Sequence, residues 1–246
     1  MMSVNVTDSQ REEGSIDYIQ KAISPLASDF CGNIRKALCC DRVELRVDCP
    51  IKYLDLYRQE IEDKVADVIA VRYKYLFLKK LLRCEGLPLY EKELLFTALI
   101  AADIEDDKAY IIRKIRNMEI FTVDGIFNFR IKPLKYRWQE IASFIPPYFS
   151  SSQLGDFIAY LVGEKRGKRI VLENGRVYDG NKNELCRSSL IDGKGDPVRE
   201  ILLSASGKIE VVGSIGGQEE RYLKSFFGRR ITFLDGSLAK TVDKKN

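Results

Sequence analysis

The residue types that usually carry acid–base or metal chemistry are incomplete in this chain, because it contains no histidine. Histidine is the usual general base near neutral pH and the commonest ligand of zinc. Its absence excludes Ser-His-Asp and Cys-His catalysis within the chain, together with every metal site that needs an imidazole. Carboxylate, lysine or tyrosine chemistry stays open, so an unrecognised enzyme is the third interpretation of the chain. The missing histidine favours a protein that is not an enzyme, and we predict neither catalytic residues nor a cofactor.

The six cysteines are the next candidates for chemistry. No two of them are separated by two residues, so a zinc ribbon or a thioredoxin-like motif is unsupported. We expect free thiols that bind no metal and behave as small apolar residues in a reducing compartment. The cysteines are Cys31, Cys39, Cys40, Cys49, Cys84 and Cys186.

A group of glycines suggests a phosphate site. Gly213, Gly216 and Gly217 lie between an expected strand and an expected helix, where glycines can cradle a phosphate. Neither the dinucleotide fingerprint nor a P-loop motif is complete, however. Glu219 and Glu220 would also place negative charge in the first helical turn, where it repels a phosphate. We therefore predict a plain strand-to-helix turn.

An acidic cluster at 103–107 resembles a magnesium site, because Asp103 and Asp107 would share a face of one continuous helix. Acidic residues are also favoured in the first turn of any helix. Carboxylates alone do not define a magnesium site. We favour the start of a helix and predict no metal site.

Composition narrows the class of protein further. The 246 residues are 45% hydrophobic and 31% charged, which is ordinary for a globular protein. The net charge of +4 is weak evidence for a polyanionic partner. No apolar run approaches the ~20 residues of a membrane span, and no signal peptide opens the chain. We expect a cytoplasmic protein without membrane contact, with a polar and frayed stretch at 1–14.

Helical periodicity dominates the first half of the chain. Apolar residues recur three and four positions apart, which is typical of helices with one buried face. Pro25 predicts a kink in the first helix, and residues 43–47 alternate like a short strand. The expected helices are 15–40, 54–82, 90–102, 105–116 and 133–145.

The strongest local signal lies at 118–131. Two alternating runs flank Asp124-Gly125, which suits the positive φ angles of a tight hairpin turn. In that hairpin, Phe127 and Phe129 would share the buried face and pack on the helix of Trp138. Arg130 would then point to solvent or to an acidic partner, because side chains alternate along a strand.

Helices followed by a hairpin also occur in winged-helix modules, which gives an alternative function. Helix 105–116 would be the recognition helix and 118–131 the wing. Several cations would then face phosphates, but interleaved carboxylates predict weak binding to nucleic acid. The cations are Lys108, Arg113, Lys114, Arg116, Arg130, Lys132, Lys135 and Arg137.

The second half alternates between strands and helices. Asn174-Gly175 predicts a hairpin between 169–173 and 176–178, and Ser150–Ser152 can cap a helix that runs to about residue 162. The alternation of 197–206, 208–212, 218–227 and 229–234 indicates parallel strands with crossover helices. We expect a boundary near 146–152, between a mainly helical region 1–149 and a small α/β region 150–246, with a loose tail from Ser237.

A family resemblance adds a biological setting. The segment Val123-Asp-Gly-Ile-Phe-Asn-Phe-Arg-Ile-Lys132, leading into Trp138-Gln-Glu-Ile141, is similar to a signature of the YtxC-like family. The similarity covers roughly 90–236, and Phe129-Arg130 carries most of it. The resemblance implies a sporulation-associated protein of endospore-forming bacteria, and it brings no catalytic residues.

Together these observations predict an α+β protein that is helical in its N-terminal part, with a central hairpin and a small α/β C-terminal part. The expected function is a non-enzymatic, sporulation-associated role that depends on an unknown protein partner. Nucleic-acid binding is the alternative. The predicted interaction residues are Arg130, Lys132, Arg113 and Lys114.

Overall fold

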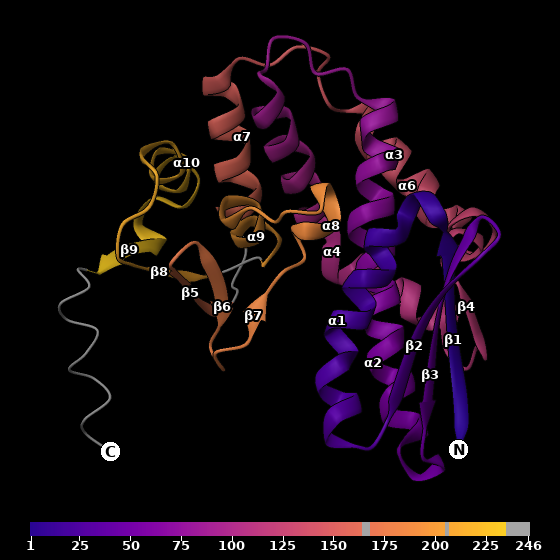
Figure 1. Ribbon diagram of the computed structural model, residues 1–246. Helices are drawn as coiled ribbons and strands as arrows, with labels where there is room; N and C mark the ends of the chain where they lie inside the picture. Colours follow the sequence, from indigo (N-terminus) through magenta and orange to yellow (C-terminus); the bar gives the residue numbers. More distant parts are fainter. Residues whose placement is uncertain (164–167, 205–206, 235–246) are drawn as a thin grey trace, which may run out of the picture. The chain divides into compact units, whose positions relative to one another are not determined.

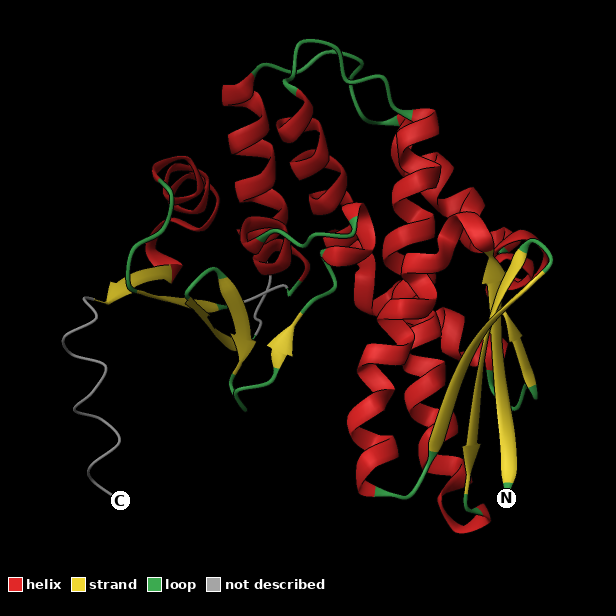
Figure 2. Cartoon of the chain, in the orientation of Figure 1, coloured by secondary structure: helices red, strands yellow, loops and turns green. Residues whose placement is uncertain are grey.

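The computed structural model describes residues 1–163, 168–204 and 207–234, which form two compact units that are interleaved in the sequence (Figure 1). The first unit comprises Met1–Leu81 and Ile104–Phe144, and the second comprises Leu82–Asp103 and Ile145–Asn246. Both units combine helices with a small sheet (Figure 2), which confirms the α+β class. The tail expected from Ser237 lies outside the described residues.

The sheet of the first unit has four strands in the order β2-β3-β1-β4. Strand β1 lies inside the sheet, antiparallel to β3 and parallel to β4. The prediction of a frayed N-terminus is therefore wrong. Val4, Val6 and Asp8 of β1 are buried on one face, and this alternation is the strand signal that the polar composition of 1–14 hid. The strands are β1 Met2–Ser9, β2 Asn33–Cys39, β3 Arg42–Cys49 and β4 Ile120–Thr122.

Helix α1, Glu13–Asp29, packs on the buried face of this sheet (Figure 1). This helix continues through Pro25 and ends at Asp29. The second part of the helix predicted for 15–40 instead forms strand β2. The chain turns through Cys31, which has a positive φ of 55°, and Gly32. A Cβ at Gly32 would lie 2.2 Å from the Tyr57 hydroxyl, so only glycine fits this close approach.

The helices after β3 hold the core of the first unit. Helix α2, Leu54–Asp67, continues through a π-helical stretch, Val68–Tyr73, into α3, Lys74–Leu81, which confirms the long helix expected there. The two helices predicted at 90–102 and 105–116 are one helix, α4, Leu89–Ile115. Its first half belongs to the second unit and its second half to the first.

The predicted hairpin at 118–131 is wrong. Only β4 is a strand, and it pairs with β1. The chain then enters α5, Val123–Gly125, and a second π-helix, Ile126–Arg130, before α6, Lys132–Ser143. Gly125 has φ −65° and ψ −43°, a helical conformation without a positive φ.

Two tertiary contacts override the turn preference of Asp124-Gly125. Strand β1 takes the pairing edge of β4, and Arg42 donates two hydrogen bonds to the Asp124 carboxylate, at 3.1 and 2.6 Å. Val123 and Ile126 are both buried at a spacing of three, which is a helical period.

The second unit has a five-stranded sheet in the order β7-β6-β5-β8-β9. Strands β5, β8 and β9 are parallel, as the alternation of strands and helices predicted. Asn174 and Gly175 have φ values of 51° and 75° and join β5 to β6, which confirms that hairpin. The strands are β5 Arg169–Glu173, β6 Arg176–Asp179, β7 Glu184–Leu185, β8 Lys208–Val212 and β9 Ile231–Leu234.

Helices pack on this sheet and on one another within the second unit. Helix α10 contacts α7, α9 and β9, and α9 contacts β6. The Ser150 hydroxyl accepts a hydrogen bond from the Gln153 backbone N–H at 3.3 Å, so this serine caps α7 as expected. The helices are α7 Ser151–Gly163, α8 Ser189–Asp192, α9 Pro197–Leu203 and α10 Gly217–Phe227.

Candidate functional site

A buried carboxylate, Asp107, holds α6 in place within the first unit. Its Oδ2 accepts hydrogen bonds from Trp138 Nε1 at 2.8 Å and from Lys74 Nζ at 2.7 Å. Its Oδ1 accepts one from Arg137 Nη2 at 3.3 Å. We call these four residues the Asp107 cluster. It ties α3, α4 and α6 together through one charged group.

The Asp107–Lys74 pair within this cluster is almost completely removed from water. The Asp107 side chain is 0% exposed and the Lys74 side chain 2%. Desolvating two charges is costly unless the pair is well oriented and further hydrogen bonds satisfy it. Trp138 and Arg137 supply those hydrogen bonds, so the cluster fixes the orientation of α6 closely.

The two π-helical stretches of the first unit meet beside this cluster. The ring of Tyr73 lies 4.8 Å from the ring of Phe127, centroid to centroid. Lys135 Nζ lies over the Phe127 ring, 4.7 Å from its centroid. The Tyr73 hydroxyl donates a 2.5 Å hydrogen bond to Asp8 Oδ1. Single π-helical turns occur often at functional sites, and here they position the segment that leads into α6.

Burial raises the pKa values of both Asp8 and Tyr73. It raises the pKa of the Asp8 carboxyl to about 6, although hydrogen bonds from Tyr73 and the Ser9 backbone N–H partly oppose the rise. Burial and the nearby Asp8 charge also raise the pKa of Tyr73 above its usual range. The tyrosine therefore remains the proton donor of the pair at physiological pH.

Outward from this buried support, the segment presents what we call the basic–aromatic surface: Phe129, Arg130, Lys132 and Tyr136. All four side chains are exposed, with Phe129 at 75% and Tyr136 at 70%. Lys132 and Tyr136 are four residues apart and so share a face of α6. The buried face of that helix instead carries Leu134, Trp138 and Ala142.

The charge of this segment has one sign. Four cations and no acidic residue occur between Asp124 and Glu140. Lys135 and Arg137 are engaged locally, with the Phe127 ring and with Asp107. The exposed positive charge of the surface therefore comes mainly from Arg130 and Lys132.

The exposure of Phe129 corrects the prediction that it packs on the Trp138 helix. That prediction assumed the two-residue period of a strand. In the helical turn that actually forms, Ile126 and Ile131 are buried, whereas Phe129 points away from the core. Arg130 is exposed, as the predicted orientation required.

The four predicted interaction residues fall into two pairs. Arg130 and Lys132 belong to the basic–aromatic surface. Arg113 and Lys114 are exposed in the last turn of α4, each within 6 Å of the Tyr110 ring: Arg113 Cζ at 5.9 Å and Lys114 Nζ at 5.5 Å from its centroid. Among the described contacts, none joins one pair to the other.

Lys108 does not face solvent, contrary to the recognition-helix hypothesis. Its Nζ is 2.7 Å from Asp67 Oδ1 and 2.9 Å from Asp63 Oδ1, and its side chain is 7% exposed. The wing required by the same hypothesis is helical. The geometry that motivated a winged-helix module is therefore not present.

The prediction that assigned Asp107 to a helix start missed its pairing with Lys74. A signal was present in the chain. Ile104, Ile111 and Ile115 mark the buried stripe of α4, and positions 107 and 108 fall within that stripe. A charged pair on an apolar face indicates buried partners.

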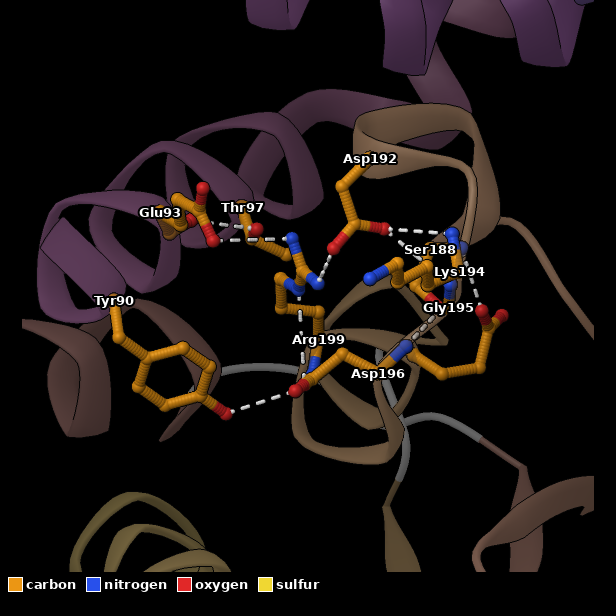
Figure 3. A network of polar contacts seen from close by, with 10 residues as sticks. Tyr90, Glu93, Thr97, Ser188, Asp192, Lys194, Gly195, Asp196 and Arg199 are labelled. Carbon is orange, nitrogen blue, oxygen red and sulfur yellow. Dashed lines mark hydrogen bonds and ion pairs between the residues drawn. The ribbon is translucent and has the colours of Figure 1, made fainter. Parts of the chain in front are cut away.

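In the second unit the arrangement of charges is reversed, because a buried cation, Arg199, is surrounded by carboxylates (Figure 3). The Arg199 guanidinium lies 3.3 Å from Glu93 Oε2, 2.5 Å from Asp192 Oδ2 and 3.7 Å from Asp196 Oδ1. We call these four residues the Arg199 cluster. Tyr90 donates a 3.0 Å hydrogen bond to Asp196 and extends the cluster to the first half of α4.

The Arg199 cluster fixes a loop. Asp192 Oδ1 accepts hydrogen bonds from the backbone N–H groups of Lys194 at 3.1 Å and Gly195 at 3.3 Å. Asp196 Oδ1 caps α9 by accepting from the Arg199 N–H at 2.8 Å. Each carboxylate of the cluster holds the Arg199 guanidinium, and two of them also accept from backbone N–H groups, so we assign the cluster a structural role.

The other candidates for chemistry are also accounted for. Glu219 Oε2 accepts a 3.2 Å hydrogen bond from the Gly216 N–H, so that donor serves the start of α10. The six cysteines form no disulfide. Among the described residues, no group of three cysteines or carboxylates is arranged to hold a metal ion, and none of the helices there is both long and apolar enough to cross a membrane.

Comparisons with family models, curated proteins and solved structures found no match to this chain. The fold and the site therefore define the class on their own: an α+β protein of two interleaved units with a rigidly supported basic–aromatic surface.

Proposed function

We propose that this protein acts without catalysing a reaction, by binding an acidic protein partner through the basic–aromatic surface. The observation that carries the proposal is the exposure of Phe129 and Tyr136 beside Arg130 and Lys132, on a segment whose other face is locked by Asp107. Aromatic residues and arginine are enriched where protein interfaces gain most of their affinity. A rigid support lowers the entropy that binding costs.

The charge favours a protein partner over nucleic acid. Affinity for a nucleic acid grows with the number of phosphates that are neutralised. Two exposed cations on the basic–aromatic surface, with Arg113 and Lys114 not joined to them, offer few such contacts. An acidic segment with apolar side chains would pair with Arg130 and Lys132 and cover the two rings.

The setting that we propose is the cytoplasm of sporulating cells. The resemblance to the YtxC-like family supports it, and Phe129-Arg130, which carries most of that resemblance, lies on the proposed surface. Six cysteines without a disulfide are in keeping with a reducing compartment.

Capture from sporulating cells tests the proposal. Tagged wild-type protein is compared with a Phe129→Ala/Arg130→Ala variant and with Tyr160→Ala, which changes an exposed ring of the second unit. The proposal expects one protein to co-purify with the wild type and with Tyr160→Ala, to be lost with the double variant and to be resistant to nuclease. Equal recovery with all three proteins, or recovery that nuclease abolishes, would contradict it.

A cellular readout completes this test. The double variant is expected to fold normally and yet to fail to restore spore formation in a strain that lacks the protein. Full restoration by a folded double variant would show that the surface is not needed.

A further inference from the structure

A cavity of about 470 Å³ lies in the first unit, between α2 and the end of α4. It is independent of the basic–aromatic surface. Its size falls within the range of small-molecule sites, but its lining is polar where such sites are usually apolar. From α2 come Arg58, Gln59 and Glu62, and after α4 come Arg116 and Asn117. A polar lining indicates a polar occupant.

The two arginines give the cavity its specificity. Arg58 Nε is buried and makes no hydrogen bond, and neither Arg58 nor Arg116 forms an ion pair with any described residue. A buried donor without a partner destabilises a folded protein, and a ligand that accepts from it removes that cost. Guanidinium groups match the planar, two-oxygen geometry of carboxylates and phosphates.

Three carboxylates also line the cavity, and the lysines nearby engage one of them. Asp63 pairs with Lys108 at 2.9 Å and with Lys64 at 3.0 Å. Glu62 Oε1 accepts a hydrogen bond from the Asn117 backbone N–H at 3.3 Å. Asp55 is exposed. None of these three carboxylates forms an ion pair with Arg58 or Arg116, so both guanidinium groups can face a ligand.

The walls of the cavity are fixed before any ligand arrives. The buried Lys108–Asp67 pair, at 2.7 Å, ties α4 to α2. Asn117 has a positive φ of 65°, which ends α4 and turns its backbone N–H toward Glu62. Preorganisation of this kind reduces the entropy lost on binding.

We infer that this cavity binds a small molecule through an oxyanion, either a phosphate or a carboxylate, held between Arg58 and Arg116. The site is separate from the proposed protein-binding surface. Its role would be to make the first unit responsive to a small anionic metabolite.

The test is a titration of the full-length protein with inorganic phosphate, and in a second arm with succinate, at constant ionic strength. The arginine Nε–H signals are followed by NMR. We expect the Arg58 Nε–H signal to shift saturably with at least one probe, and the probe that binds more tightly identifies the oxyanion. No saturable shift with either probe would overturn the inference.

Variants make the assignment specific. Arg58→Gln and Arg116→Gln should each weaken binding about tenfold or more, as expected for loss of a charge-assisted hydrogen bond. Arg113→Gln, in the last turn of α4 but outside the lining, should change it less than about twofold. Arg58→Lys keeps the charge without the planar fork, so it tests the geometry if Arg58→Gln unfolds. Equal weakening by Arg113→Gln would show nonspecific attraction.

Discussion

The Asp107 cluster of the first unit and the Arg199 cluster of the second bury charge in opposite ways. Asp107 and Lys74 are both withdrawn from water, at 0% and 2% exposure. In the Arg199 cluster only the arginine side chain is withdrawn from water, at 3% exposure. The carboxylates Glu93, Asp192 and Asp196 remain 22%, 34% and 15% exposed. The Asp107–Lys74 pair therefore has no access to water if it is broken, although Arg137 at the edge of its cluster is 44% exposed. The carboxylates of the Arg199 cluster all reach water.

This difference indicates what each cluster is for. A fully desolvated pair tolerates little movement, so the Asp107 cluster suits a support that must hold the basic–aromatic surface in one position. Carboxylates that reach water can adjust, so the Arg199 cluster suits a loop clamp. Four substitutions test this comparison, in order of decreasing expected effect on the free energy of unfolding.

Asp107→Ala should have the largest effect. It leaves the Lys74 ammonium buried without this carboxylate and removes the acceptor of Trp138 Nε1. The expected loss is about 3–5 kcal/mol, as for other broken buried ion pairs. Urea unfolding measures it, and Asp106→Ala, at the exposed neighbouring position, is the matched control with an effect within about 0.5 kcal/mol. Similar losses for both variants would refute the role of Asp107.

Arg199→Met should cost less, about 2 kcal/mol, because the three carboxylates it leaves behind can be hydrated. The effect should also depend on pH. Burial raises the pKa of Asp192, but Arg199 and two backbone N–H groups more than offset this and lower it below the usual range. The stabilisation that arises from the lowered pKa is present at neutral pH and is lost as the pH falls below about 4.

The comparison fails if Arg199→Met destabilises the protein more than Asp107→Ala does. It also fails if the cost of Arg199→Met is the same at neutral and at acidic pH. Chemical unfolding of both variants at the two pH values decides between these outcomes.

Asp8→Asn should stabilise the protein, by about 1–2 kcal/mol at pH 7.5. The pKa of Asp8 is raised to about 6, so ionising it in the folded state costs stability. That cost is absent below about pH 4, where folded and unfolded states both hold the proton, and it develops as the pH rises through 6. The gain over wild type should therefore vanish at about pH 4. A gain that is independent of pH would mean that Asp8 does not titrate in this way.

Phe129→Ala should have the smallest effect, within about 0.5 kcal/mol, because the ring is exposed. Thermal unfolding in parallel with Trp138→Ala, which removes a fully buried ring and should cost about 3–5 kcal/mol, provides the scale. A loss for Phe129→Ala that approached the Trp138→Ala value would mean that Phe129 belongs to the core.

Two similar turn signals show how far the sequence could predict this fold. Asp124-Gly125 and Asn174-Gly175 both favour tight hairpins, but only the second forms one. The β5–β6 hairpin is closed by its own neighbouring strands, so local preference is enough. At Asp124 the outcome depends on β1 and Arg42, more than 80 positions away in the chain, and no local pattern contains that information.

The same limit applies to the candidate site. The basic character of Arg130 and Lys132 could be predicted from the sequence, because exposed cations need no partner. The exposure of Phe129 could not, because it follows from a helical rather than an extended backbone. The Asp107 cluster required knowing that α3, α4 and α6 meet, although the stripe of isoleucines on α4 pointed to a buried position.

Site-specific photo-cross-linking at position 129 tests directly whether the basic–aromatic surface binds a protein partner. A photoreactive phenylalanine replaces Phe129 in sporulating cells, and in a matched strain it replaces Tyr160, which is also exposed. We predict one discrete protein adduct from position 129. This adduct should be absent from position 160 and lost when Arg130→Glu and Lys132→Glu are added. Adducts of equal yield from both positions, or an adduct to nucleic acid, would contradict it.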